Sequence, residues 1–272
     1  MSGITVPSDV SAALEGRMGV AVELAQMAGR STLELFQTNQ VQVERKGDDS
    51  PVTQADRRAE ELIRAALSER FPDDAILGEE FGSQEGSTEF QWIVDPIDGT
   101  KSFISGVPLY STLVGIVSGK QCLGGVVFIP ALDEIVFAAR GAGAWHSKNG
   151  SVPERCRVSE RPLSEGLFVV SQVDSFAEHA SAESYLALER EAYITRSWGD
   201  GYGYLLVATG RAELMVDPIA NAWDLAAVQP VVEEAGGKFT SWDGEPHVFG
   251  GNGVGSNGKI HDHVLSKLRI SE

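Results

Sequence analysis

The stretch from residue 92 to residue 103 limits the possible fold more than any other, and it reads Trp-Ile-Val-Asp-Pro-Ile-Asp-Gly-Thr-Lys-Ser-Phe. Its apolar start is typical of a buried strand. Pro96 lacks a backbone N–H and fixes φ, so we expect the strand to end there and a short helix to begin near Thr100. Asp95 and Asp98 would then lie just past the carboxyl end of a strand, beside free amide groups.

Two carboxylates beside free backbone amides favour one kind of chemistry. Carboxylate oxygens are hard ligands that suit Mg²⁺. The amides at the start of a helix suit a phosphate group. The same stretch is also compatible with a polar turn in which an aspartate caps the helix. Metal-assisted chemistry on a phosphate therefore requires further ligands from elsewhere in the chain.

Helical and strand patterns both occur around this stretch. Apolar residues at helical spacing predict one long helix over residues 9–39, and a capping-box-like start at Thr53 predicts a second helix that ends near residue 70. Beyond residue 103, apolar segments separated by short turns predict an antiparallel meander, unlike the alternating strands and helices of a nucleotide-binding sheet. Its strands are expected at residues 110–117, 122–129, 134–139 and 144–146.

The chain has 272 residues, of which 42% are hydrophobic, enough for one large domain or two closely joined ones. Residues 147–161 are rich in Gly, Pro, Ser and charge, which predicts a boundary between two halves. We expect an N-terminal α+β half over residues 1–150 that carries most metal ligands. A C-terminal α/β half over residues 151–272 would carry Asp224 and the residues that select the substrate.

The net charge and the cysteine content limit the kinds of partner and the cellular compartment that we expect for this chain. The formal net charge of −17 opposes binding to a nucleic-acid backbone, and no basic cluster offsets it. No apolar segment is long enough to span a bilayer, and the first residues do not resemble a signal peptide, so no membrane partner is expected. The two cysteines, Cys122 and Cys156, form no paired motif, which favours a reduced, cytoplasmic setting.

Acidic side chains recur where apolar stretches end or helices begin. Glu79 follows the apolar residues 75–78, Asp224 precedes Leu225, and Asp56 stands at a helix start. If these residues converge with the two central aspartates in one cleft, burial and mutual repulsion would raise their pKa values steeply. Divalent cations remove that penalty. Two Mg²⁺ ions would bring four positive charges against the carboxylates and a phosphate dianion.

Three motifs occur in the order found in the inositol monophosphatase superfamily. Gly78-Glu79-Glu80, Asp95-Pro96-Ile97-Asp98-Gly99-Thr100 and Trp223-Asp224-Leu225-Ala226-Ala227 resemble its signature sequences. The resemblance implies an α+β fold, a layered α-β-α-β-α sandwich. It also implies Mg²⁺-dependent hydrolysis of a small-molecule phosphate monoester, with two or three Mg²⁺ per active site. Relatives are commonly dimers, so a homodimer is expected.

The roles of individual residues follow from the same resemblance. Metal ligands are implied at five positions: Glu79, Asp95, the carbonyl of Ile97, Asp98 and Asp224. Gly99 and Thr100 would donate backbone N–H groups to the phosphate. Thr100, polarised by Asp56, would position the attacking water together with Glu79. A metal-activated water makes a covalent enzyme intermediate unnecessary.

Three further segments are similar to the histidinol-phosphate phosphatase branch: residues 100–108, 199–204 and 208–213. The implied reaction converts L-histidinol phosphate to L-histidinol and phosphate, a step of histidine biosynthesis. Its substrate carries an ammonium and an imidazole, and Asp217 stands where the family has a substrate-binding acid. The substrate-binding candidates are Asp98, Asp200, Asp217, Asn221 and Asp224. A surface carboxylate or helix cap is an equally good interpretation of Asp200.

Three alternatives remain open from the sequence. Inositol 1-phosphate is the other candidate substrate, because substrate groups in this superfamily overlap. A bisphosphate nucleotidase or sugar bisphosphatase would require more basic residues near the motifs for a second phosphate. A non-catalytic homologue that only binds a phosphorylated metabolite would have no need for Thr100 together with Asp56.

Overall fold

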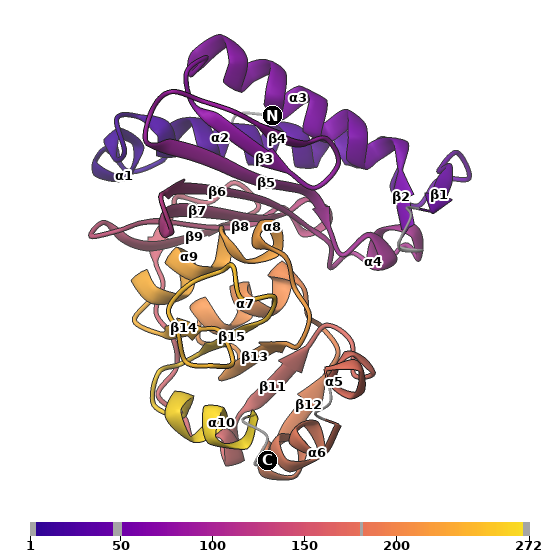
Figure 1. Ribbon diagram of the computed structural model, residues 1–272, viewed down its shortest axis with the longest axis vertical. Coiled ribbons are helices and arrows are strands. Elements are labelled where there is room, and N and C mark those ends of the chain that lie inside the picture. Colours follow the sequence, from indigo (N-terminus) through magenta and orange to yellow (C-terminus); the bar gives the residue numbers. More distant parts are fainter. Residues whose placement is uncertain (1–3, 46–50, 180–181, 269–272) are drawn as a thin grey trace.

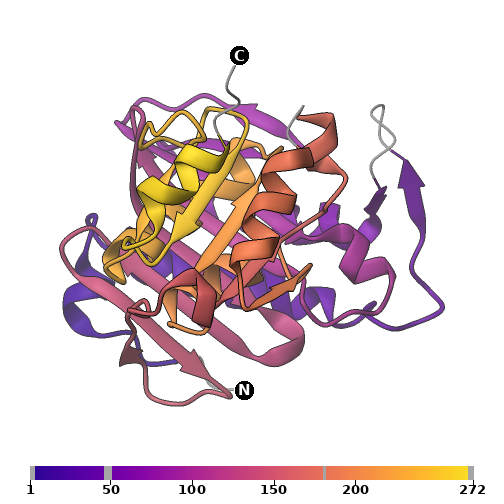
Figure 2. The same cartoon turned by 90° about the horizontal axis from the view of Figure 1, so that it is seen from below.

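Two β-sheets alternate with three layers of helices in the computed structural model, which describes residues 4–45, 51–179 and 182–268 (Figure 1). The first layer holds α2 (Arg17–Thr32) and α3 (Gln54–Arg70). The layer between the sheets holds α7 (Gly201–Ala208), α8 (Ala222–Leu225) and α9 (Val228–Glu234). The last layer holds α5 (Ser175–Glu178), α6 (Ala182–Glu191) and α10 (His261–Leu268), and Figure 2 shows α6 and α10 beside each other on the outer face of the second sheet. The predicted α-β-α-β-α sandwich is confirmed.

The first sheet has eight strands in the order β10-β9-β8-β7-β6-β5-β3-β4. The strands are β3 (Ala75–Gly78), β4 (Gly82–Gln84), β5 (Phe90–Asp98), β6 (Ser111–Ser118), β7 (Gln121–Ile129), β8 (Glu134–Ala139), β9 (Gly143–Lys148) and β10 (Glu154–Arg155). Strands β5 to β9 pair with antiparallel neighbours in sequence order, as the predicted meander requires. Only β3 and β5 pair in parallel among the described strands of this sheet.

The second sheet has five strands in the order β12-β11-β13-β15-β14. They are β11 (Leu167–Val170), β12 (Ile194–Arg196), β13 (Leu214–Asp217), β14 (Lys238–Thr240) and β15 (Gly253–Ser256). A separate pair, β1 (Val43–Arg45) with β2 (Pro51–Thr53), and two short helices, α1 (Ser8–Ala12) and α4 (Thr100–Ile104), complete the regular elements discussed below. The predicted boundary after residue 150 falls between β9 and β10, and this division into halves stays a prediction.

Apolar clusters fill the spaces between the layers. The central cluster joins Ile93 and Leu113 of the first sheet to Leu205, Val228 and Phe239 from the other half of the chain. Two further clusters lie on the outer faces of the two sheets. Burial of apolar area on both faces of each sheet is the main force that fixes the layers. Within the described residues, no helix has both the length and the apolar character needed to cross a membrane.

The prediction of a single long helix over residues 9–39 is wrong. The chain forms α1 and α2 instead, with Leu14, Glu15 and Gly16 between them at φ values of 55°, 58° and 83°. Such left-handed backbone cannot belong to a right-handed α-helix. Apolar residues keep a helical spacing on both sides of the break, which is why periodicity alone did not reveal it.

The strand expected to end at Pro96 also differs from the structure. Strand β5 runs on to Asp98, with a register shift between Asp95, which pairs with Leu113, and Asp98, which pairs with Ser111. Between these pairs, two residues on β5 oppose one on β6, so the strand contains a bulge. Pro96 is tolerated because a bulge leaves a backbone donor unpaired. Residues three apart in a regular strand face opposite sides, so this extra residue lets both aspartates face the same side.

A buried ion pair fastens α2 to the first sheet. Arg17 Nε and Nη2 donate to the Asp74 carboxylate at 2.7 and 2.9 Å, and Trp92 Nε1 and Thr88 Oγ1 donate at 2.9 and 2.6 Å. The guanidinium also lies over the Phe90 ring, 3.9 Å from its centroid. Burial alone would raise the pKa of Asp74, but the hydrogen bonds from Arg17, Thr88 and Trp92 hold it below its ordinary value.

Asp74→Ala is expected to lower the free energy of unfolding by about 3–5 kcal/mol, because it leaves the Arg17 guanidinium buried and unpaired. Urea unfolding measures the change. The exposed pair Lys238–Asp262 provides the control, since Asp262→Ala should cost less than about 1 kcal/mol. Equal unfolding midpoints for wild type and Asp74→Ala would contradict the assignment of a stabilising role to this pair.

Candidate metal and phosphate site

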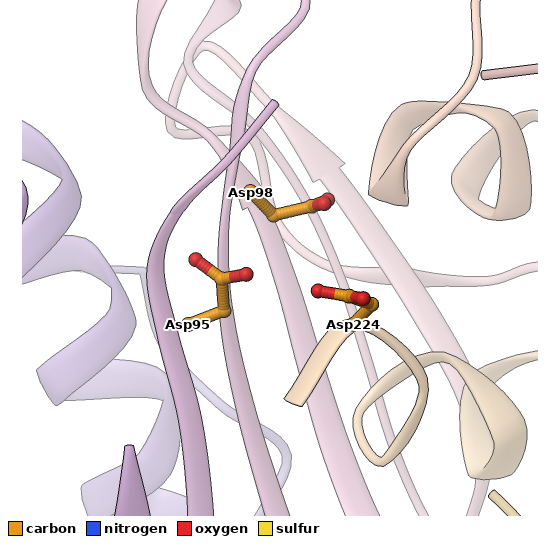
Figure 3. Close-up of side chains that lie close together, drawn as sticks. All are labelled: Asp95, Asp98 and Asp224. Carbon is orange, nitrogen blue, oxygen red and sulfur yellow. The ribbon is translucent and has the colours of Figure 1, made fainter. Parts of the chain in front are cut away.

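Three aspartates from two distant segments meet between the first sheet and the central helices. Asp95 and Asp98 come from the end of β5, and Asp224 comes from α8 (Figure 3). Each offers a carboxylate oxygen that lies within 4.8 Å of an oxygen of both others. The structure therefore brings together three of the five predicted metal ligands.

The other predicted residues lie in or behind one cavity of about 510 Å³. The predicted residues that line it are Glu79, Asp98, Gly99, Thr100, Asp200, Asp217, Asn221 and Asp224. Asp95 belongs to the aspartate cluster, and Ile97 is fully buried with its carbonyl oxygen 3.2 Å from Thr100 Oγ1. Asp56 is fully buried and contacts the hydroxyl of Thr100, which lines the cavity. No predicted site residue lies away from this region.

Asp98 is held by two residues that the sequence did not single out. Ser111 Oγ and the Gly201 backbone N–H both donate to Asp98 Oδ2, each at 2.5 Å. A Cβ on Gly201 would lie 2.4 Å from Ser111 Oγ and 2.8 Å from Asp98 Oδ2, so only glycine fits. The available signal was the Gly-rich segment after Asp200, which marks a close backbone approach. Both donors use the same oxygen, so neither occupies Oδ1.

Asp224 and Asp56 both stand at the third position of a helix with a capping box. In α8 the Asn221 backbone N–H donates to Asp224 Oδ2 at 2.6 Å. In α3 the Thr53 backbone N–H donates to Asp56 Oδ2 at 2.9 Å, while Asp56 Oδ1 lies 3.3 Å from Thr100 Oγ1. The capping box fixes each carboxylate, because its donor and the helix restrict the rotamer. The predicted contact between Asp56 and Thr100 is present.

The cluster is strongly unfavourable without a cation. Burial, and then the negative charge of Glu79, raise the pKa of Asp95 well above its usual range. Burial also raises the pKa of Asp98, with Asp200 and Asp224 adding to it, and the pKa of Asp224 rises to about 7. Buried like charges repel, and a bound divalent cation removes the repulsion.

The donor set matches a hard divalent cation. All three clustered groups are carboxylates, and Glu79 lines the same cavity. Oxygen-only ligands favour Mg²⁺, Mn²⁺ or Ca²⁺ over Zn²⁺, which prefers sulfur and nitrogen. Lys101 is the only cationic side chain among the described residues that line the cavity, and its ammonium contacts the Gln172 side chain. One lysine cannot neutralise the surrounding carboxylates, so these residues fit a metal site.

A second acidic group, Asp217 and Asp200, lines the same cavity. Asp217 ends β13, and burial raises its pKa to about 7. Ser171 Oγ donates to Asp217 Oδ1 and accepts the Asp200 backbone N–H at 3.0 Å. Asp200 is held at φ 55° and ψ −157°, a conformation that costs energy for a residue other than glycine. Burial also raises the pKa of Asp200. Ser171 thus contacts both the Asp217 carboxylate and the Asp200 backbone, and both acidic residues line the cavity.

Comparison with known proteins agrees with this geometry. Residues 14–272 match the model of the inositol monophosphatase family. A protein of Chlorobaculum parvum called histidinol-phosphatase is 44% identical, with 93% of this chain and 96% of that protein aligned. A Mycobacterium tuberculosis protein of the same name is 40% identical over 92% and 96% of the two chains. The solved structure of a Thermotoga maritima IMPase superposes with a TM-score of 0.81 at 32% identity, covering 93% of this chain and 96% of its own.

Proposed function

This chain belongs to the inositol monophosphatase family, and from that premise we propose that it hydrolyses L-histidinol phosphate to L-histidinol and phosphate with Mg²⁺. The observation that carries the proposal is the convergence of Asp95, Asp98 and Asp224 beside a cavity of about 510 Å³. The substrate is suggested by the two relatives called histidinol-phosphatase.

The clustered aspartates would hold the metal together with Glu79 and the carbonyl of Ile97. Bound Mg²⁺ would activate water and stabilise negative charge on the phosphoryl and leaving oxygens. Its presence also accounts for the burial of so many carboxylates, which otherwise favour their neutral forms. Two or three Mg²⁺ ions are proposed per site, as the family resemblance implies.

The residues after the bulge would bind and orient the reacting groups. Gly99 is the N-cap and Thr100 the first residue of α4, and both line the cavity, so their backbone N–H groups can donate to phosphate oxygens. The Thr100 hydroxyl lies 3.3 Å from Asp56 Oδ1, which polarises it toward an attacking water. Glu79, in the turn after β3, would orient the same water. The water attacks phosphorus, the ester P–O bond breaks, and the proton passes through these groups to the leaving alkoxide.

The carboxylates of Asp217 and Asp200 give a reason to propose histidinol phosphate as the substrate. The ammonium of histidinol phosphate requires anionic partners, and Asp217 and Asp200 both contact Ser171 and both line the cavity. Burial strengthens their attraction to a cation, since the local dielectric is low. Asn221 at the rim would contact the substrate as well. An inositol ring carries no positive charge and would leave these carboxylates without a counter-ion.

Phosphate release from a panel of esters tests the proposal. The panel contains histidinol phosphate, inositol 1-phosphate, adenosine 3′,5′-bisphosphate and fructose bisphosphate, each with and without Mg²⁺. We expect Mg²⁺-dependent release with a preference for histidinol phosphate. A preference for inositol 1-phosphate would overturn the substrate assignment and leave the chemistry intact. No release from any ester would indicate a non-catalytic binding protein.

Asp217→Asn is expected to lower kcat/KM for histidinol phosphate by about 10- to 100-fold, because a hydrogen bond to a charged group contributes about 1.5–3 kcal/mol. Hydrolysis of phenyl phosphate, which has no ammonium, should change little and serves as the control. Equal losses on both substrates would contradict a role in ammonium recognition. The same comparison with Asp200→Asn decides whether the two carboxylates share this role.

Two further features are proposed on the family resemblance. We propose a homodimer, which sedimentation of the purified protein would test. We also propose a cytoplasmic location, because the two cysteines, Cys122 and Cys156, form no paired motif in the sequence.

A further inference from the structure

Two residues on α3 hold the turn that carries Glu79. Glu60 is fully buried, and its Oε2 accepts the Glu80 backbone N–H at 2.8 Å while its Oε1 accepts the Phe81 N–H at 3.3 Å. Arg64, one helical turn later, donates through Nε to Glu60 Oε1 at 2.7 Å and through Nη2 to the Gly82 carbonyl at 2.5 Å. The pair thus binds the backbone at three consecutive residues directly after Glu79.

The turn after β3 packs tightly against the Glu60 carboxylate. A Cβ added to Gly78 would lie 2.0 Å from Glu60 Oε1 and 2.4 Å from its carboxyl carbon. Glycine at the end of β3 therefore lets the backbone approach the carboxylate closely. Glu79 lies between this glycine and the two amides that Glu60 binds. Its backbone N–H also donates to the Val94 carbonyl at 3.3 Å, which ties it to β5.

One face of α3 contacts both Thr100 and the turn that carries Glu79. Asp56, Glu60 and Arg64 are spaced four residues apart, so their side chains leave one face of the helix. Asp56 contacts Thr100, and Glu60 binds the segment that follows Glu79. A single rigid helix therefore sets the separation between the proposed water-orienting groups.

We propose that Glu60, paired with Arg64, is a positioning residue that holds Glu79 in place to bind metal and orient water. This inference rests on the proposed function of Glu79. Among the described residues, the partners of the Glu60 carboxylate are all donors: two backbone N–H groups and the Arg64 guanidinium. A glutamine at this position turns an NH₂ group toward at least one of these donors. The turn then loses a bond, and Glu79 loses its fixed position.

The experiment measures Mn²⁺ affinity by calorimetry for the wild type and Glu60→Gln. We expect the Kd for Mn²⁺ to rise about 10- to 100-fold, the usual effect of losing a group that orients a metal ligand. Amide hydrogen exchange at Glu80 and Phe81 should accelerate in the same variant. In the phosphatase assay kcat should fall and the Mg²⁺ activation constant should rise, while KM for the ester changes little.

Glu213→Gln is the matched control. Like Glu60, Glu213 is fully buried and lies against a glycine, Gly166. Its carboxylate also accepts hydrogen bonds, among them those from Arg161 Nε at 2.8 Å and the Leu167 N–H at 2.5 Å. Glu213 directly precedes β13, and Asp217 is the last residue of that strand. We expect a comparable loss of stability in this variant with an unchanged Kd for Mn²⁺.

Arg64→Lys keeps the charge but loses the two-pronged contact with Glu60 and Gly82, so it should weaken Mn²⁺ binding in the same direction by a smaller factor. This milder change keeps the test decisive if Glu60→Gln does not fold. Wild-type Mn²⁺ affinity and wild-type exchange in the folded variants would overturn the inference. Absence of phosphatase activity in the wild type would instead overturn the proposed function, because metal affinity and exchange are measured without substrate.

Discussion

Asp98→Asn is expected to lower kcat by about 10³-fold, since metal stabilisation of the transferring phosphoryl group amounts to several kcal/mol and each 1.36 kcal/mol is a factor of ten. The substitution removes one charged ligand from the aspartate cluster. Asparagine keeps an oxygen that can accept the bonds from Ser111 and Gly201, so the fold should persist. Steady-state kinetics at saturating Mg²⁺ measures the loss.

The stability of the same variant separates a lost ligand from a damaged fold. Burial and neighbouring carboxylates raise the pKa of Asp98, so its ionised form is costly near neutral pH. Without metal, Asp98→Asn should therefore be more stable than the wild type in urea. Asp262→Asn on the exposed face of α10 should leave both activity and stability unchanged. Full activity of Asp98→Asn would remove Asp98 from the ligand set.

Without divalent cations, the free energy of unfolding is expected to fall as the pH rises toward neutrality. The folded-state pKa values of Asp217 and Asp224 are about 7, against an ordinary value of 3.8. A raised pKa means that the folded protein binds more protons than the unfolded chain in this window. The free energy of unfolding then falls as the pH rises from about 4 to about 7. With Mg²⁺ bound the carboxylates stay ionised, and this loss should disappear.

Urea unfolding in EDTA and in saturating MgCl₂, from about pH 5 to about pH 8, measures the effect. His261 acts in the opposite direction: burial lowers its pKa to about 4, so stability is lost as the pH falls below 6.5. The contribution of His261 is common to both solutions and cancels in their difference. That difference should therefore grow with pH, and a constant difference would contradict the role of the buried carboxylates in binding metal.

The sequence predicted the parts of the fold and site that local patterns determine. The meander was predictable because each strand is an apolar run bounded by turn residues, and hairpins join neighbours in sequence. The acidic motifs were recognisable because each carboxylate follows an apolar segment such as Ala75–Gly78 or stands in the first turn of a helix. Family resemblance then indicated that Glu79, Asp98 and Asp224 share one site.

Features that depend on backbone geometry or distant contacts were not predictable. The break between α1 and α2 uses Leu14 and Glu15, two residues that do not signal left-handed backbone in a sequence. The bulge at Pro96 is defined only by the register with β6. Glu60 reads as an ordinary charged helix residue until the turn after β3 is placed against it. Such long-range partners require three-dimensional structure.

Anomalous scattering from manganese tests the metal site most directly. Crystals grown with Mn²⁺ should show a strong anomalous peak between the carboxylates of Asp95, Asp98 and Asp224, with Glu79 at its edge. The Asp98→Asn protein should show that peak weakened or lost. An active wild-type enzyme whose crystals hold no manganese among these three aspartates would contradict the metal-dependent mechanism.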